Sequence, residues 1–231
     1  NYTFGHLISW INLPKISSSE DTIIYLYYGN QGALNQENSE AVWTNNYYGV
    51  WHLHEDYLDS TSYNNDGTNF GSTKTDGMIG NGRLFGGDDY ITASDHCLGS
   101  NHSWTASCWF HSDTTSTNDF HYLFSTGGFQ DNDAVNIWHY LDSIGELRAQ
   151  IIDSSGDNID LWDYSGPNFD DDQWHLHHVT WNKTTHALSL FVDGTLIHQI
   201  INTDVNEGNG TNYDLYLGAR NDLNTERMLI G

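Results

Sequence analysis

Apolar and polar residues alternate along most of this chain, in short runs that are separated by turn residues. A period of two places every second side chain on the same face of a β-strand. In SLFVDGTLIHQI, at 189–200, the dipeptide Asp193-Gly194 stands between two such runs, which indicates a hairpin. Only Gln31–Glu40 could form a short helix. The chain is therefore predicted to be all-β, an antiparallel β-sandwich of the jelly-roll kind.

The alternation and the turns between the runs give the expected strands. They are Ser9–Leu13, Thr22–Tyr28, Tyr48–Glu55, Gly82–Phe85, Tyr90–Ala93, Ser103–His111, His121–Ser125, Ala134–Leu141, Glu146–Asp153, Asn158–Trp162, Gln173–Trp181, Ala187–Val192, Thr195–Ile201 and Asp214–Gly218.

The charge is strongly unbalanced, with 31 acidic against 7 basic residues and a formal net charge of −24. Such a surface repels the phosphate backbone, so nucleic acid is excluded as a partner. Three explanations of the acidity stay open: a surface solvated for high salt, calcium binding by Asp-rich loops, or recruitment of a cationic partner. No apolar run approaches the roughly 18 residues that a membrane span needs.

Cysteine and asparagine positions bear on where the protein works. Cys97 and Cys108 are the only cysteines, and a single disulfide or a buried thiol are both compatible with the sequence. Glycosylation sequons favour an extracellular or cell-surface location; they begin at Asn1, Asn101, Asn182 and Asn209.

A family resemblance covers most of the chain. In order, GVWHLHE, DSTSYNNDGT, GMIGNGRLFGGDDYIT, SWTASCWF, FSTGG, DDQWHLHHVTWN, LSLFVDGTLI and YLGA resemble a LamG-like (concanavalin A-like lectin/glucanase) domain. The resemblance implies a jelly-roll domain over 47–231, whose closing strand would follow a phrase beginning near Met228 and is missing. Residues 1–46 resemble the C-terminal part of a β-rich domain of unknown function that precedes such domains in archaeal and bacterial surface proteins.

The letters WHLH occur twice, at 51–54 and 174–177, and bring together His52, His54, His175 and His177, with His178 following. A zinc site needs three or four ligands that meet at about 2.0–2.2 Å. We favour the simpler interpretation, in which both copies are core-forming strands whose Trp and Leu point one way and whose histidines point the other. Five tryptophans in strong strand patterns are assigned to the core: Trp51, Trp104, Trp109, Trp174 and Trp181.

Catalysis is not expected. Glucanases similar to this family carry E-x-D-x-E on one strand, because that spacing puts the carboxylates on one face. The nearest approach here is Glu55-Asp56 with Asp59, whose spacing breaks the parity.

Calcium is the expected metal, in a structural role, because the resemblance implies it and Asp-rich loops offer hard oxygen ligands. The first candidate loop is 59–67, with Asp59, Asn64 and Asp66 as ligands, joined by Asp88 and Asp89. Two other groups are alternatives: Asp153 with Asp157 and Asp160, and the run 170–172.

Aromatic loop residues are the candidates for binding a glycan, because aromatic rings stack on the apolar faces of sugars. They are Trp162, Tyr164 and Phe169, with Tyr63. We therefore expect a non-catalytic extracellular module of a larger cell-surface protein, which serves adhesion or glycan binding. The alternative is a structural subunit of a surface filament, sheath or stalk that contacts neighbouring subunits, and a glycan-active enzyme comes third.

Overall fold

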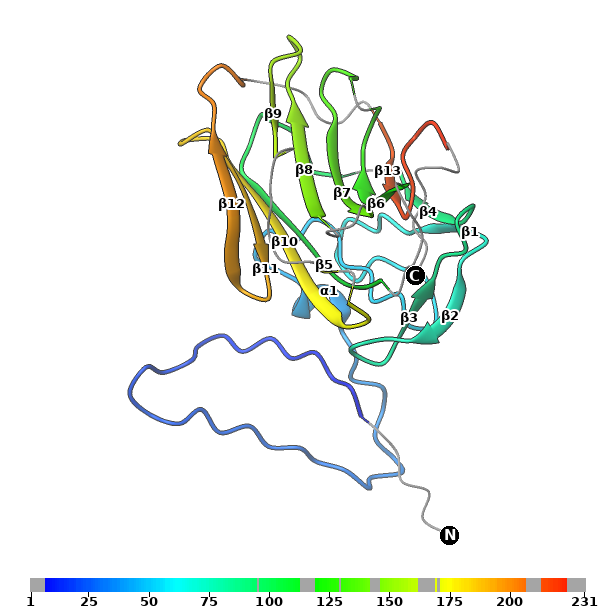
Figure 1. Cartoon of the computed structure of the whole chain (residues 1–231). Coiled ribbons are helices and arrows are strands. Elements are labelled where there is room, and N and C mark those ends of the chain that lie inside the picture. Colours follow the sequence, from blue (N-terminus) through cyan, green and yellow to red (C-terminus); the bar gives the residue numbers. More distant parts are fainter. Residues whose placement is uncertain are drawn as a thin grey trace.

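Two antiparallel sheets form the body of the protein in the computed structural model, which describes residues 7–94, 96–112, 119–128, 130–141, 146–161, 169, 171–206 and 213–223 (Figure 1). The larger sheet has the strand order β1-β4-β13-β6-β7-β8-β9, and the smaller one β12-β11-β10-β5. A separate hairpin pairs β2 with β3. The predicted all-β sandwich is confirmed.

The strands of the larger sheet are β1 (Thr68–Phe70), β4 (Tyr90–Ala93), β6 (Asp119–Ser125), β7 (Val135–Leu141), β8 (Glu146–Ile152), β9 (Asn158–Asp160) and β13 (Leu215–Leu217). Those of the smaller sheet are β5 (Trp104–His111), β10 (Trp174–Asn182), β11 (Ala187–Val192) and β12 (Thr195–Ile201). The hairpin consists of β2 (Thr73–Asp76) and β3 (Asn81–Leu84).

The smaller sheet shows how alternation sets the core. β10 pairs antiparallel with β5, with Val179 opposite Ala106 and Trp181 opposite Trp104. Val179 and Trp181 are buried, while alternate residues of both strands are partly exposed. This buried face packs over β7 and β8, whose Ile137, Leu147 and Ile151 belong to the same hydrophobic cluster. Burying apolar surface is the main stabilising contribution to such a sandwich.

Turn chemistry explains the hairpin between β11 and β12. Asp193 has φ 48° and Gly194 has φ 79°, so both central residues are left-handed. That backbone twist matches the twist of the flanking strands, which confirms the predicted Asp-Gly hairpin.

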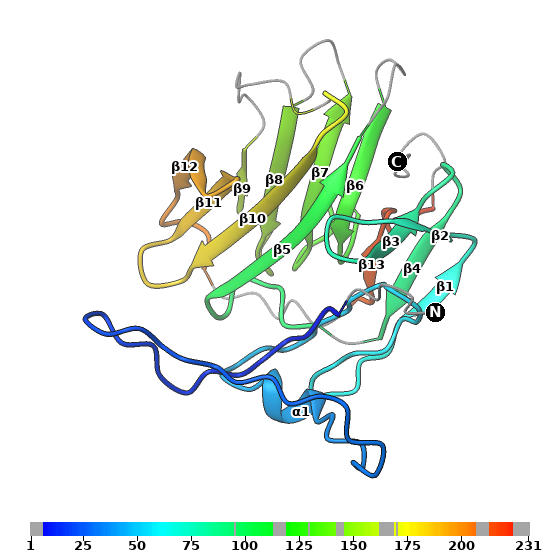
Figure 2. The ribbon, with the colours of Figure 1, turned by 90° about the horizontal axis from the view of Figure 1, so that it is seen from below.

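The N-terminal region differs from the prediction. Residues 7–46 contain no strand, and their only regular element is α1 (Ser39–Val42), which overlaps the end of the predicted helix. The segments Ser9–Leu13 and Thr22–Tyr28 are extended but unpaired, and residues 12–41 project from the sandwich as an open loop (Figures 1 and 2). A strand needs a hydrogen-bonded neighbour, and alternation alone does not supply one. The expectation of a β-rich N-terminal segment is wrong for the described residues.

The first WHLH also departs from the prediction, because Tyr48–Glu55 contains only an isolated bridge between Trp51 and Asp59. Trp51 and Leu53 still pack against the hydrophobic cluster. Leu53 has φ 56°, a left-handed backbone that a regular strand excludes. The segment is therefore a core-covering loop. The short strands β1 and β2 were not predicted, since they carry little apolar alternation.

Among the described residues, no helix is both long and apolar enough to cross a membrane. Cys97 and Cys108 are not joined by a disulfide. Burial raises the pKa of the Cys108 thiol to about 12, so it stays protonated at physiological pH.

Candidate functional site

An aromatic surface lies on the outward face of the smaller sheet. We define the aromatic platform as Trp109 and His111 of β5 with Trp174 and His178 of β10. These positions alternate with the buried ones, so their side chains point away from the core. Trp174 is directly opposite His111 in the register. The platform therefore follows from the pairing of two strands that are distant in sequence.

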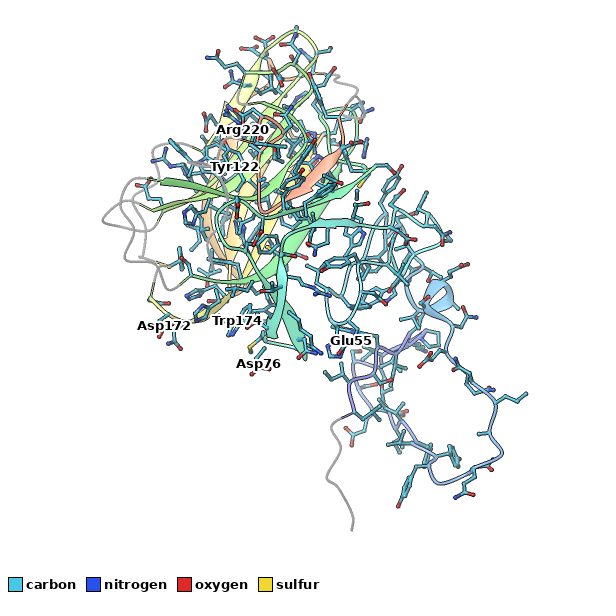
Figure 3. The ribbon with its side chains drawn as sticks, turned by 90° about the vertical axis from the view of Figure 1, so that its right-hand side faces the viewer. Glu55, Asp76, Tyr122, Asp172, Trp174 and Arg220 are labelled. Atoms are coloured by element: carbon cyan, nitrogen blue, oxygen red, sulfur yellow. The ribbon has the colours of Figure 1, made fainter. Side chains whose placement is uncertain are left out.

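The platform combines apolar ring surface with a carboxylate. The rings of His111 and Trp174 have centroids 5.4 Å apart. His111 Nε2 lies 3.2 Å from Oδ1 of the exposed Asp172. Trp109 is 36% exposed. In Figure 3, Asp172 and Trp174 are both labelled at the lower left of the sandwich, away from Tyr122 and Arg220.

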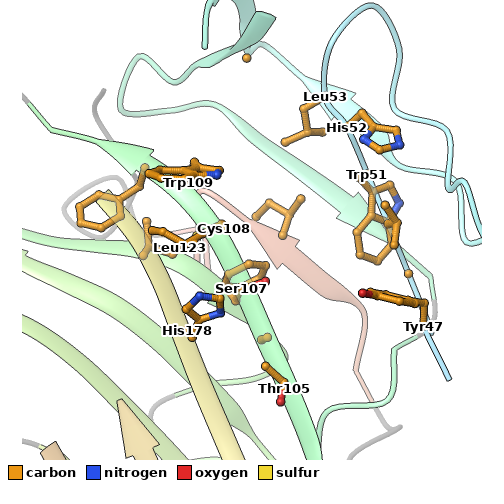
Figure 4. Close-up of a pocket in the computed structure, with 18 of the residues that line it drawn as sticks. Tyr47, Trp51, His52, Leu53, Thr105, Ser107, Cys108, Trp109, Leu123 and His178 are labelled. Carbon is orange, nitrogen blue, oxygen red and sulfur yellow. The ribbon is translucent and has the colours of Figure 1, made fainter. Parts of the chain in front are cut away.

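The four platform residues are part of the lining of a cleft of about 2430 Å³. Its walls are the edge of β5, the loop 45–54 and the β2–β3 hairpin, and its floor includes Leu123, Leu215 and Leu217 of the larger sheet. Figure 4 shows Trp109 and Ser107 on β5 facing this space from one side, with Trp51 and Leu53 on the other. The cleft thus lies where the smaller sheet stops covering the larger one.

The cleft lining is nearly free of acidic residues. Asp76 is the only carboxylate among the described residues that line it, although the chain has 31 acidic residues. Arg83 also lines it and lies over the Tyr57 ring, 4.3 Å from the centroid. The cleft is therefore a neutral area of a strongly acidic protein.

The second WHLH provides a structural ion pair. His175 Nδ1 lies 2.8 Å from Asp193 Oδ2, and its Nε2 lies 3.1 Å from Asp171 Oδ1. Burial lowers the pKa of His175, but its hydrogen bonds to these two carboxylates outweigh the effect of burial and leave the pKa raised. Asp193 also accepts the Leu176 N–H at 2.8 Å, so this pair connects the β11–β12 turn to β10.

The prediction of which β10 residues share a face is confirmed, but the face that was assigned to the core, with Trp174, is the outward one. His177 is buried and His175 is mostly covered, on the same side as Val179 and Trp181. Trp174 faces outward, as does Trp109, so both are wrongly assigned to the core. A signal was present in the sequence, because both tryptophans have the opposite parity to their neighbours Trp181 and Trp104.

The five histidines do not form a metal site. His52 stacks on Trp10, with ring centroids 5.3 Å apart, and His54 Nδ1 accepts the Asn81 N–H at 2.9 Å. In the part of the chain that the structure describes, no three His, Cys, Asp or Glu side chains gather closely enough to hold a metal ion.

The predicted calcium loop is organised by hydrogen bonds. The buried Asp59 carboxylate accepts from the backbone N–H groups of Val50, Thr61 and Asn65 and from the Thr61 hydroxyl, at 2.8–3.0 Å. Both of its oxygens are thus occupied. A calcium ligand set needs six to eight free oxygens directed at one point, and Asp59 does not fit that role.

The other predicted calcium ligands also make hydrogen bonds of their own or are exposed. Asp66 accepts the Asp59 N–H at 2.9 Å, while Asn64 is exposed with its amide donating to Ser62 O. Asp89 accepts the Gly86 N–H at 2.7 Å in its own turn, next to the exposed Asp88. The structure thus gives no preformed calcium cage at this loop, and calcium binding stays a prediction.

The alternative acidic groups also have structural partners. Asp153 is buried and accepts from the backbone of Ser155, Asp157 and Asn206. These hydrogen bonds outweigh the effect of burial, so the pKa of Asp153 is lowered. Asp160 accepts from the Gln150 amide at 3.3 Å. Asp171 pairs with His175, and Asp172 pairs with His111 of the platform. Asp170 lies outside the described residues.

Glu55, one of the carboxylates that came nearest to a glucanase pattern, has a lysine and an asparagine as partners. Glu55 lies 2.5 Å from Lys74 Nζ and accepts from Asn81 Nδ2 at 3.2 Å. The hydrogen bond from Lys74 is the main cause of the lowered pKa of Glu55. A general acid needs a raised pKa, so Glu55 is unsuited to that role.

The predicted sugar-contact residues are only partly suited to that role. Phe169 is buried in the core and makes an edge contact with His175, so this prediction is wrong. Tyr63 is 53% exposed and stacks on Tyr48 at 4.3 Å, which leaves one ring face accessible. Trp162 and Tyr164 lie outside the described residues.

Two of the four sequons lie in the described residues. Asn182 is exposed at the end of β10, and its Oδ1 accepts from the N–H groups of Thr184 and Thr185. Asn101 is partly exposed, and its Oδ1 contacts His102 Nδ1. Asn1 and Asn209 lie outside the described residues.

The sequence matches one protein-family model, described as the concanavalin A-like lectin/glucanases superfamily, over residues 85–229. No curated protein matches the sequence at a significant level.

Solved structures of the same fold come from toxins and from a carbohydrate-active enzyme. The binding domain of Paraclostridial mosquitocidal protein 1 superposes with a TM-score of 0.56 at 16% identity, over 73% of this chain and 42% of that one. The binding domain of botulinum neurotoxin serotype G gives 0.53 at 14% identity, over 69% and 40%. This chain thus spans less than half of either toxin domain.

Domain 4 of AbnA, an extracellular arabinanase of Geobacillus stearothermophilus, was solved in complex with arabinotriose. It gives a TM-score of 0.50 at 21% identity, over 71% of this chain and 79% of that one. At these identities the three likenesses show the fold alone.

Proposed function

Because the chain belongs to the concanavalin A-like lectin/glucanase superfamily, we propose that it is a non-catalytic extracellular module that binds neutral glycans. The observation that carries this proposal is the aromatic platform, where two tryptophans of adjacent strands face outward beside a carboxylate. Aromatic rings stack on the C–H faces of sugars, and a carboxylate such as Asp172 accepts hydrogen bonds from hydroxyl groups.

The charge of the protein favours neutral over acidic glycans. A net charge of −24 repels sialylated or sulfated chains at long range. Domain 4 of AbnA, whose bound arabinotriose is a neutral oligosaccharide, supports the same class of ligand. That protein is also described as extracellular, in agreement with the sequons.

Two properties of the described residues support a binding role over hydrolysis. Glycoside hydrolysis uses a pair of carboxyl groups about 5–5.5 or 6.5–9.5 Å apart on either side of the scissile bond. The described lining of the cleft has a single carboxylate, Asp76. Glu55, outside that lining, is paired with Lys74.

A glycan array followed by calorimetry tests the proposal. We expect neutral oligosaccharides to bind and acidic ones not to bind. Trp109→Ala and Trp174→Ala should each weaken binding about fivefold or more, because one aromatic contact contributes about 1 kcal/mol. Phe70→Ala is a matched control, since Phe70 is 43% exposed on β1, away from the platform.

Binding that neither tryptophan variant changes would remove the platform from the proposal. An array without any bound glycan would overturn the lectin function itself. Hydrolysis of a β-glucan above background would overturn the non-catalytic assignment.

A further inference from the structure

The outer edge of β5 faces the cleft. Among the described strands, β5 is the last one of its sheet and pairs only with β10. Residues of both faces of β5, including Ala106, Ser107 and Cys108, line the cleft, so the strand presents its edge to it. The backbone groups at such an edge are a template for one more strand.

The size and lining of the cleft suit a segment of polypeptide. Small-molecule sites have volumes of about 300–1,000 Å³, and this cleft of about 2430 Å³ is larger. Its floor is apolar, since it includes Leu123, Leu215 and Leu217 of the larger sheet. An added strand would therefore pair with β5 by its backbone and bury alternate side chains on this floor.

The projecting loop contains a segment of the matching kind. Thr22–Tyr28, TIIYLYY, consists of residues that favour strands, and its last six side chains are between 57 and 92% exposed. Six adjacent exposed apolar side chains form a patch that soluble proteins seldom leave uncovered. The segment has seven residues and β5 has eight, so their lengths match.

The distribution of charge permits the segment Thr22–Tyr28 of one copy to approach the cleft of another. With a net charge of −24, most surfaces of two copies repel each other. Thr22–Tyr28 carries no charge, and the described lining of the cleft has one carboxylate and one arginine. The cleft and the segment are thus two neutral, apolar surfaces that can approach without like-charge repulsion.

The base of the loop holds the segment away from its own domain. Asn12 Nδ2 donates to Ala41 O at 3.0 Å, and Trp10 stacks on His52. From this base, Thr22 lies ten residues along the chain and can reach up to about 35 Å outward. In Figure 2 the loop extends beyond the sandwich.

We propose that Thr22–Tyr28 of one copy pairs with the outer edge of β5 in a second copy, inside the cleft. Each copy has one such segment and one such edge, so the exchange can be reciprocal or continue from copy to copy. Trp109, His111, Trp174 and His178 of the aromatic platform also line this cleft, so a paired segment would cover the platform. The proposal does not require glycan binding, and it agrees with the alternative of a structural subunit.

Sedimentation velocity over a range of protein concentrations tests the proposal with the full chain. We expect association in the wild type and at least tenfold weaker association in Leu26→Pro, because proline removes a strand hydrogen-bond donor. Leu34→Pro is the matched control: Leu34 is 82% exposed in the same loop but lies outside the segment. Leu26 is 71% exposed, so its replacement should leave the fold of the sandwich intact, which circular dichroism verifies.

Hydrogen exchange identifies the surfaces that pair. In the associated protein, the amides of Thr22–Tyr28 that face β5, and the β5 amides that point away from β10, should become protected, and Leu26→Pro should abolish both effects. A synthetic peptide of residues 20–30 should compete and dissociate the copies. A protein that stays monomeric, an association that Leu26→Pro leaves unchanged, or protection of both segments within a monomer would each overturn the proposal.

Discussion

The two WHLH segments share four letters and adopt different structures. The second, at 174–177, lies in β10 and pairs with β5 and, from His177 onward, with β11. The first, at 51–54, is a loop with one bridge residue and a left-handed leucine. Strand partners stabilise the second copy, whereas the buried carboxylate of Asp59 stabilises the first. The comparison teaches that partners far along the chain decide whether an alternating run becomes a strand.

The largest loss of stability is expected for a substitution of Asp59, because the loop that contains the first WHLH depends on its carboxylate. Asp59→Ala leaves three backbone N–H groups and one hydroxyl without their acceptor. We expect the free energy of unfolding to fall by about 3 kcal/mol, measured by urea denaturation. Asp66→Ala is the control, because Asp66 is exposed and accepts the Asp59 N–H; it should cost about 1 kcal/mol.

The same variant separates hydrogen bonding from calcium binding. If Asp59 acts through hydrogen bonds, Asp59→Ala lowers Tm equally with calcium and with EGTA. If it binds calcium, EGTA lowers the Tm of the wild type and leaves that of the variant unchanged. The second result would restore the calcium loop predicted from the sequence.

The second prediction compares the leucines of the two copies. At Leu176, in β10, glycine should be less stable than alanine by about 1 kcal/mol, because glycine weakens a strand. At Leu53, with φ 56°, glycine should be at least as stable as alanine, since it removes the strain of the left-handed backbone. Thermal melts of the four variants measure this reversal. Glycine less stable than alanine at both positions would contradict the left-handed conformation of Leu53.

The smallest effect is a pH dependence of opposite sign in the two copies. Carboxylate hydrogen bonds raise the pKa of His175 above 6.5 despite its burial, so its stabilising contribution is complete below that pH and is lost as pH rises. Burial lowers the pKa of His52, so its contribution is present above pH 6.5 and is lost as pH falls. His175→Gln should therefore cost more stability at about pH 5.5 than at about pH 8.5.

The matched variant His52→Gln should show the reverse order, with the larger loss at the higher pH. Denaturation curves at both pH values measure the two differences. Equal pH profiles for His175→Gln and the wild type would show that the Asp171 and Asp193 contacts do not favour the charged imidazole.

The sequence predicted most of the sandwich because period-two alternation and Asp-Gly turns are local signals. Tyr90–Ala93, Ala187–Val192 and Thr195–Ile201 agree with the prediction residue for residue. Thr22–Tyr28 shows the limit of local signals, since it consists of residues that favour strands and has no partner strand.

The site was less predictable than the fold. Trp109 and Trp174 form a platform only because the two strands pair in one register, which sequence periodicity does not reveal. Phe169 was expected to be a contact residue because it was assigned to a loop, yet it belongs to the hydrophobic core and lies against His175. The roles of such residues depend on which neighbours the fold brings to them.

The place of β5 in its sheet has a consequence for synthesis. Its sequence neighbours along the chain join the opposite sheet, and its one described partner, β10, follows much later. At about 5–20 residues per second, both edges of β5 stay uncovered for several seconds while the chain from His111 to Trp174 is made. β6, β7, β8 and β9 pair one after another in the same interval. The growing chain can therefore assemble a meander of the larger sheet before the smaller sheet closes over it.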